Sequence, residues 1–82
     1  MTITVRFFAA YRQLTGVDRL ELEVAPAATV TDVINQLEQR YPLLAGKLQT
    51  NALVALNERY VQRETALQPN DTAAFFPPVS GG

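Results

Sequence analysis

The sequence predicts an α+β domain in which a sheet of about five strands packs against one main amphipathic helix. Two segments near the start alternate apolar and polar residues, which is typical of strands with one buried face. A longer segment in the middle carries apolar residues at helical spacing, and the second half contains short apolar runs separated by turn residues. Strands that share one amphipathic helix are expected to form two layers around a single core.

The first two strands are predicted at residues 2–8 and 19–24. Apolar and polar residues alternate in both, and only Phe8 departs from the pattern by placing an aromatic ring on the polar face. Each strand should therefore have one solvated face, and the two are expected to pair antiparallel. Residues 9–14 between them suit a short helix that Gly16 would end.

The main helix is predicted to begin after Thr29, a candidate N-cap, with Asp32 near the positive end of the helix dipole. Pro42 should stop it, because the residue before proline is pushed out of the α region. A weaker helical segment at 43–49 is interrupted by glycine. The helix carries one continuous apolar stripe made of Val30, Val33, Ile34, Leu37 and Tyr41.

Three further strands are predicted at residues 52–56, 60–61 and 72–76. A strong turn signal at 68–71 precedes the last of them. The order of elements is satisfied by the β-grasp, or ubiquitin-like, arrangement, although the pattern alone does not fix the strand order. We expect a β-grasp domain over residues 1–76 and a flexible functional tail over residues 77–82.

Composition disfavours several classes of function. Seven basic and eight acidic residues are scattered along the 82, so no basic stripe for nucleic acid is present. The absence of cysteine and histidine removes the commonest nucleophile, general base and metal ligands, and we assign no metal site. The opening residues lack a basic segment followed by a long apolar run, so neither a signal peptide nor a membrane span is expected. We expect a cytoplasmic protein.

The last residues offer one reactive group, the carboxylate of Gly82. Pro77 and Pro78 cannot continue a sheet ladder, so the residues after them are expected to form an arm that reaches roughly 20 Å from the domain. Val79 and Ser80 would belong to this arm. Gly81 and Gly82 have no side chain and would pass through a narrow channel.

A free carboxylate is a poor electrophile and would have to be activated first, as an acyl phosphate or acyl adenylate. A sulfur donor or an amine could then attack it. Taken alone, a terminal glycine pair is equally well explained as an inert stub, since chance produces such a pair in roughly one chain in two hundred.

A partner-binding surface is predicted next to this arm. Phe75 and Phe76 are adjacent in the last strand, so their rings should point to opposite faces. One should enter the core, and the other, with Phe8, should form an exposed apolar patch of the kind that marks interfaces. Together with Pro77 and Pro78, these are the candidate partner-binding residues, and the pattern does not decide which of the two rings faces outward.

Several segments of the chain match one known family: Val5–Ala9 with Arg12 and Gly16, Thr29-Val30, Tyr41-Pro42, Val54–Asn57 and Asn70–Gly82. Through them the chain resembles, over nearly its whole length, the small subunits of molybdopterin synthases, the sulfur carriers of molybdenum-cofactor synthesis. The family usually has glycine where this chain has Asn70, and both residues tolerate positive φ.

The resemblance implies a β-grasp fold with a mixed sheet whose first and last strands are adjacent and parallel. It implies that an E1-like partner adenylates Gly82 with ATP and that the adenylate becomes a thiocarboxylate. The tail would then donate sulfur to cyclic pyranopterin monophosphate in the active site of the large subunit, within a heterotetramer of two small and two large subunits. The chain itself would be non-catalytic and would hold no permanent cofactor.

Three other functions remain open at this point. The chain could carry sulfur for another pathway, such as thiazole synthesis or tRNA thiolation. It could be a ubiquitin-like modifier that forms isopeptide bonds through Gly82, because the chemistry of the two classes diverges only after adenylation. It could also be a plain interaction domain. The Phe75–Pro78 stretch favours the molybdopterin synthase reading, because thiazole carriers usually lack the double proline.

Overall fold

The computed structural model describes residues 1–78. Five strands form one sheet in the order β2-β1-β5-β3-β4, and three α-helices and one short 3-10 helix accompany it. In chain order the elements are β1 (Thr2–Phe7), α1 (Ala9–Thr15), β2 (Arg19–Glu23), α2 (Val30–Arg40), η1 (Pro42–Leu44), α3 (Lys47–Asn51), β3 (Leu53–Leu56), β4 (Arg59–Tyr60) and β5 (Thr72–Phe76).

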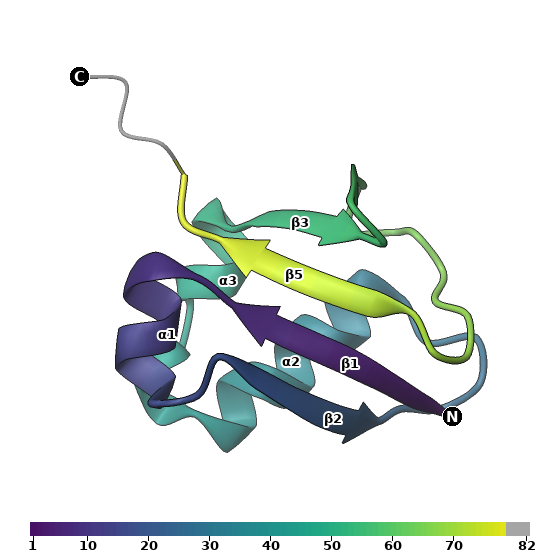
Figure 1. The fold of residues 1–82 in the computed structure, drawn as a ribbon, viewed down its shortest axis with the longest axis horizontal. Coiled ribbons are helices and arrows are strands. Elements are labelled where there is room, and N and C mark those ends of the chain that lie inside the picture. The colour runs from purple at the N-terminus through teal and green to yellow at the C-terminus, as the bar shows by residue number, and fades with distance from the viewer. Residues whose placement is uncertain (79–82) are drawn as a thin grey trace.

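The sheet is mixed, and its parallel pair lies at the centre. Strands β1 and β5 run side by side in the same direction, with Val5 opposite Ala73 and Phe7 opposite Phe75 (Figure 1). The other three pairs, β1–β2, β3–β5 and β3–β4, are antiparallel. This topology confirms the expected β-grasp fold, including the adjacent and parallel first and last strands.

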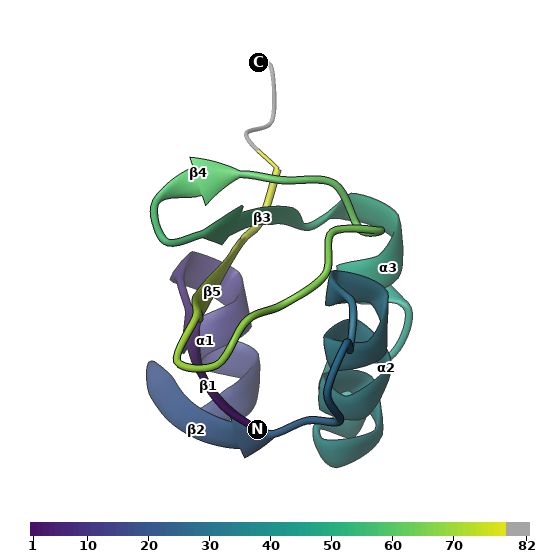
Figure 2. The ribbon, with the colours of Figure 1, turned by 90° about the vertical axis from the view of Figure 1, so that its right-hand side faces the viewer.

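Helix α2 forms the second layer and covers one face of the sheet (Figure 2). Its N-terminus carries the predicted cap, in which Thr29 accepts from the Asp32 backbone N–H and the Asp32 carboxylate accepts from the Thr29 backbone N–H. The predicted stripe is buried except for Tyr41, which is only partly buried and follows the helix as its C-cap. The core between the layers includes Ile3, Val5, Phe7, Leu22, Val33, Ile34, Leu37, Val54, Ala73 and Phe75.

Several boundaries differ from the sequence prediction by one or two residues. The first strand ends at Phe7, because Phe8 serves as the N-cap of α1. Gly16 ends α1 as predicted, with a φ of 74° that glycine adopts without strain. The weak helical segment predicted over 43–49 is interrupted at its glycine as expected, and it forms two pieces, η1 and α3, which Ala45 and Gly46 separate.

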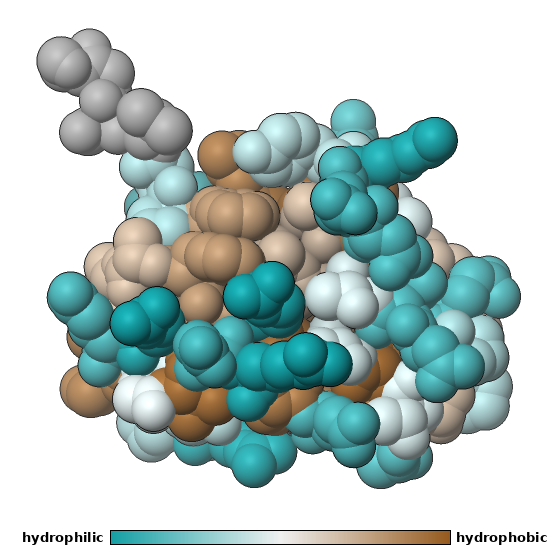
Figure 3. Space-filling model, in the orientation of Figure 1, coloured by the Kyte–Doolittle hydropathy of each residue, from teal (hydrophilic) through white to brown (hydrophobic). Residues whose placement is uncertain are grey.

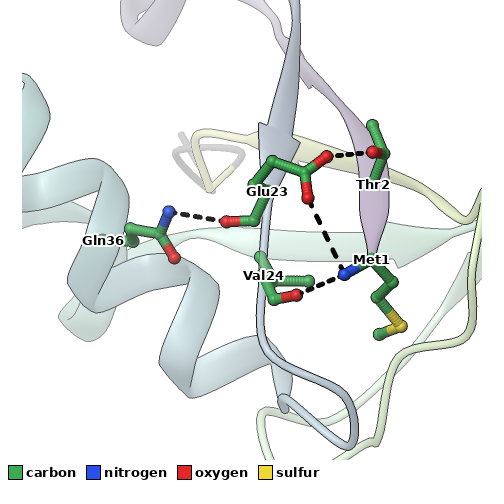
Figure 4. A network of polar contacts seen from close by, with 5 residues as sticks. All are labelled: Met1, Thr2, Glu23, Val24 and Gln36. Atoms are coloured by element: carbon green, nitrogen blue, oxygen red, sulfur yellow. Dashed lines mark hydrogen bonds and ion pairs between the residues drawn. The ribbon is translucent and has the colours of Figure 1, made fainter.

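Residues at the start of β1 are fixed to the end of β2 and to the helix layer (Figure 4). The Met1 ammonium donates to the Val24 carbonyl at 2.7 Å and forms an ion pair with Glu23 at 3.8 Å. The Glu23 side chain also accepts a hydrogen bond from the Thr2 hydroxyl, and its backbone carbonyl accepts one from Gln36 on α2 at 2.9 Å. This cluster therefore fixes the register of β1 on β2 and connects β2 to α2.

The turn between β3 and β4 is tied to the beginning of β5. Asn57 and Glu58 both have positive φ, 50° and 72°, as a two-residue hairpin of type I′ requires. The Asn57 side-chain amide donates to the Asp71 carboxylate at 2.8 Å and accepts from the Thr72 backbone N–H at 2.9 Å. Asp71 also accepts from the Gln68 backbone N–H at 2.8 Å, which is the local bonding that favours aspartate in turns.

Candidate protein-docking surface

The burial of residues in β5 shows which of its two phenylalanines faces outward. Ala73 and Phe75 point into the core, whereas Ala74 and Phe76 lie on the opposite face of the sheet. Phe75 has no exposed surface, and its ring lies 6.2 Å from that of Phe7. Phe75 is therefore a core residue, and its place among the candidate partner-binding residues is corrected. Phe76 is the ring that faces outward.

Phe8 lies beside Phe76 on this outer face. Its backbone is extended, and its N–H donates to the Phe75 carbonyl at 3.2 Å, which prolongs the β1–β5 pairing by one bond. The two rings are stacked, with centroids 4.5 Å apart and planes 13° apart. The structure thus brings together the two aromatic residues that the sequence placed next to the C-terminal arm.

Two further apolar residues extend this stack across the sheet. Leu53 of β3 lies opposite Phe76 in the antiparallel register and is 42% exposed. The Tyr60 ring of β4 lies 6.4 Å from the Phe76 ring and is 72% exposed. We define Phe8, Leu53, Tyr60 and Phe76 as the outer apolar patch. Figure 3 shows apolar surface gathered on this face at the end of the sheet where β5 ends, and hydrophilic side chains lying over much of β1 and β2 with apolar surface visible between them.

The sequence interpretation missed Leu53 and Tyr60. Leu53 belongs to a run of four apolar residues in which no alternation marks the face of each side chain. Tyr60 lies in a strand of only two residues, which is too short to show a period. Their membership in the patch follows from pairing across strands, and a linear pattern does not contain that information.

The described residues bring the patch to the point where β5 ends. Pro77 and Pro78 follow Phe76 directly, half-buried and exposed respectively. Of the residues predicted to form the functional arm, Val79, Ser80, Gly81 and Gly82 lie outside the described residues. The division of the chain into a domain over 1–76 and a flexible tail over 77–82 stays a prediction.

The patch offers apolar contact, and its one polar group is the hydroxyl of Tyr60. Within residues 1–78 no set of three His, Cys, Asp or Glu side chains is placed to hold a metal ion. Burial raises the pKa of the Tyr11 phenol, and the nearby positive charge of Arg63 partly opposes this, so the phenol is neutral at physiological pH. No helix in the described part of the chain is long and apolar enough to cross a membrane. What this surface can do chemically is bind another protein.

The chain is similar to known proteins over nearly its whole length. Residues 5–82 match the ThiS family. A molybdopterin synthase sulfur carrier subunit from Haemophilus influenzae is 40% identical over 84 residues, which cover 98% of this chain and 99% of the relative. Small archaeal modifier protein 3 from Haloferax volcanii is 37% identical over the full length of both chains.

A solved structure of a similar protein has the same fold. The solution structure of the HVO 2177 protein from Haloferax volcanii superimposes with a TM-score of 0.91 at 37% identity, covering 100% of this chain and 87% of that one. The family match and the relatives named as molybdopterin synthase sulfur carrier subunits confirm the resemblance inferred from the sequence motifs.

Proposed function

We propose that this chain, which belongs to the ThiS family, is the sulfur-carrier subunit of a molybdopterin synthase. One structural observation supports the proposal above all others. The outer apolar patch ends at Phe76, and Gly82 follows only six positions later in the chain. A surface that binds a partner at this place would deliver the terminal carboxylate to that partner. The name of the Haemophilus influenzae relative supports the same reading.

The proposed chemistry takes place at the carboxylate of Gly82. A partner adenylating enzyme of the E1 type would use ATP to form the acyl adenylate and release pyrophosphate. Sulfide-level sulfur (HS⁻ or its equivalent from a donor) would then attack the acyl carbon and displace AMP, which leaves a thiocarboxylate after loss of the proton. The chain contains neither cysteine nor histidine, so no side chain competes with the terminus as the carrier of sulfur. We expect it to hold no permanent cofactor and to work in the cytoplasm, where ATP is available.

The recipient would be cyclic pyranopterin monophosphate, held by the large subunit of the synthase. In this arrangement the outer apolar patch binds the large subunit and the arm enters its active site. Phe8, Phe76, Pro77 and Pro78 would form the contact nearest to the arm, with Leu53 and Tyr60 beside them. The chain would be the non-catalytic partner of a heterotetramer, and the basic residues that perform the chemistry would belong to the large subunit.

Intact mass spectrometry of the protein isolated from its native cells tests this function directly. Replacement of one terminal oxygen by sulfur would support a carrier. Adducts between Gly82 and lysine side chains of other proteins would instead support a modifier, the function named for the Haloferax volcanii relative. A carrier serving thiazole or tRNA thiolation would show the same thiocarboxylate but would not restore synthase activity when mixed with the large subunit.

Deletion of Gly82 tests by mutation whether the terminal carboxylate carries the activity. We expect the truncated chain to lose all synthase activity, because the activated carboxylate is misplaced by one residue. The thermal midpoint should not change, because the core ends at Phe75. Activity equal to that of the intact chain would refute the tail mechanism.

A further inference from the structure

A hollow lies in the outer face of the sheet, next to the outer apolar patch. Ala55 of β3 and Ala74 of β5 are direct cross-strand partners at its floor. Because two small side chains meet where the neighbouring positions carry larger ones, they leave an open space of about 380 Å³. The hollow is lined by Arg6, Phe8, Ala55, Asn57, Glu58, Thr72, Ala74 and Phe76.

The walls of the hollow have opposite charges on opposite sides. Arg6 borders it on the β1 side, where its guanidinium carbon lies 4.9 Å from the centre of the Phe8 ring. Glu58 borders it at the β3–β4 turn. The two aromatic rings of Phe8 and Phe76 close one end, and Asn57 and Thr72 lie at the other. A ligand would therefore meet an apolar floor with a positive and a negative side.

The positive side is stronger than one arginine would make it. Arg6 lies directly opposite Arg19 of β2, and both side chains are exposed. Like charges at opposite positions of an antiparallel pair destabilise a sheet. The one ion pair among the described residues joins Met1 to Glu23, so neither guanidinium forms an ion pair with a carboxylate of this part of the chain. Glu21 shares their face but is paired in register with Thr4.

We propose that the hollow receives one apolar side chain of the large subunit, and that a carboxylate next to that side chain binds Arg6 and Arg19. This inference rests on the proposed function, because it takes the large subunit as the partner that covers the outer apolar patch. The volume holds one large side chain, and a carboxylate of the partner would offset the two neighbouring positive charges of Arg6 and Arg19 beside this apolar surface. The charge asymmetry would fix the rotational orientation in which the arm enters its partner.

Calorimetric titration of the purified large subunit with four variants tests the proposal. Ala74→Leu fills the floor of the hollow and should weaken binding about tenfold or more, because the incoming side chain no longer fits. Arg6→Glu should weaken binding about 10- to 100-fold and reduce its dependence on salt. The same change puts a carboxylate opposite Arg19 and removes the repulsion between the two arginines. The free energy of unfolding should therefore fall by no more than the loss of the contact between Arg6 and the Phe8 ring costs.

Two matched controls separate these effects from general changes of charge and volume. Arg40 on α2 also lies over an aromatic ring, with its guanidinium carbon 5.6 Å from the centre of Tyr41, but it belongs to the helix layer. Arg40→Glu should leave the affinity unchanged. Ala45 is exposed between η1 and α3, and Ala45→Leu should also have no effect.

A charge-swap series identifies the carboxylate itself. Each acidic surface residue of the large subunit is changed to lysine, and one of these variants should bind Arg6→Glu at least tenfold better than the unchanged large subunit does. If the wild-type chain binds the large subunit and both Ala74→Leu and Arg6→Glu bind equally well, the inference is wrong while the proposed function stands. If the wild-type chain does not bind the large subunit, the proposed function itself fails. A wild-type chain that self-associates, and that Ala74→Leu makes monomeric, would assign the hollow to a second copy and overturn the inference.

Discussion

The two faces of the sheet hold pairs of phenylalanines in contrasting environments. On the inner face, Phe7 and Phe75 are fully buried under α2, and their rings are tilted by 39° at 6.2 Å. On the outer face, Phe8 and Phe76 are half-buried and lie parallel at 4.5 Å. These four residues form two adjacent pairs in the chain, so one residue step separates a core position from a surface position. Similar chemistry thus serves stability on one face and binding on the other.

The difference lies in what each pair contacts. The inner rings pack among aliphatic side chains of both layers, where removing one leaves a cavity. The outer rings contact each other, Arg6 and Tyr60, and present their remaining surface to solvent. Stacking holds the outer rings in a fixed arrangement before a partner arrives, which lowers the entropy lost on binding.

The largest effect is expected from Phe75→Ala on the inner face. Loss of a fully buried phenylalanine costs about 3–5 kcal/mol. A domain of this size has a total stability of a few kcal/mol, so we expect the variant to be largely unfolded. Urea denaturation followed by circular dichroism measures this. Phe76→Ala is the matched control and should cost about 1 kcal/mol, so equal losses for the two variants would contradict the division between the faces.

Loss of partner binding with little loss of stability is expected from Phe76→Asp on the outer face. A carboxylate in the middle of the patch would be desolvated on binding, so affinity for the large subunit should fall beyond detection. The thermal midpoint should change little, because the side chain remains half-exposed. Leu43→Asp is a suitable control, since Leu43 is 64% exposed but belongs to η1 and not to the patch. Retained binding by Phe76→Asp would disprove the assignment of this face.

Much of the fold could be predicted because local patterns carry it. The alternation in residues 2–7 and 19–23, the cap at Thr29 and the helix stripe all depend on neighbours within a few positions. The sequence predicted β5 with its observed bounds, 72–76. It left the direction of Phe75 undecided, because two alanines and two phenylalanines in a row have no alternation.

The surface around the arm was less predictable, because it is assembled across strands. Phe8 and Phe76 were found as departures from polar alternation or as neighbours of the arm. Leu53 and Tyr60 join them only through the register of β3 with β5 and β4. The hollow over Ala55 and Ala74 likewise exists only because that register puts two small residues opposite each other. Periodicity identifies a face, but it does not identify the neighbours on that face.

A smaller effect, confined to the helix layer, is expected from Thr29→Ala. The variant loses the side-chain bond to the Asp32 backbone N–H at 3.3 Å and breaks the capping box. The cost should be about 1 kcal/mol of stability, measured by urea denaturation. Binding to the large subunit should be unchanged, because Thr29 does not belong to the outer face. Reduced affinity in a fully folded Thr29→Ala sample would show that the two faces are coupled.

The smallest effect appears only at alkaline pH and concerns Tyr11, a buried residue of α1 that donates its backbone N–H to the Phe8 carbonyl. Burial raises the pKa of the phenol above its ordinary value of 10.0, with the charge of Arg63 acting in the opposite direction. The folded chain therefore keeps this proton at pH values where the unfolded chain has lost it. Below the ordinary pKa both states are protonated and the difference vanishes.

As the pH rises above 10.0, the unfolded state binds fewer protons than the folded state, so the stability falls. Tyr11→Phe removes this contribution and should show a shallower loss of stability between neutral and strongly alkaline pH, measured by urea denaturation at a series of pH values. If Tyr11→Phe loses stability as steeply as the wild-type chain over this range, the alkaline loss does not arise from burial of the Tyr11 phenol.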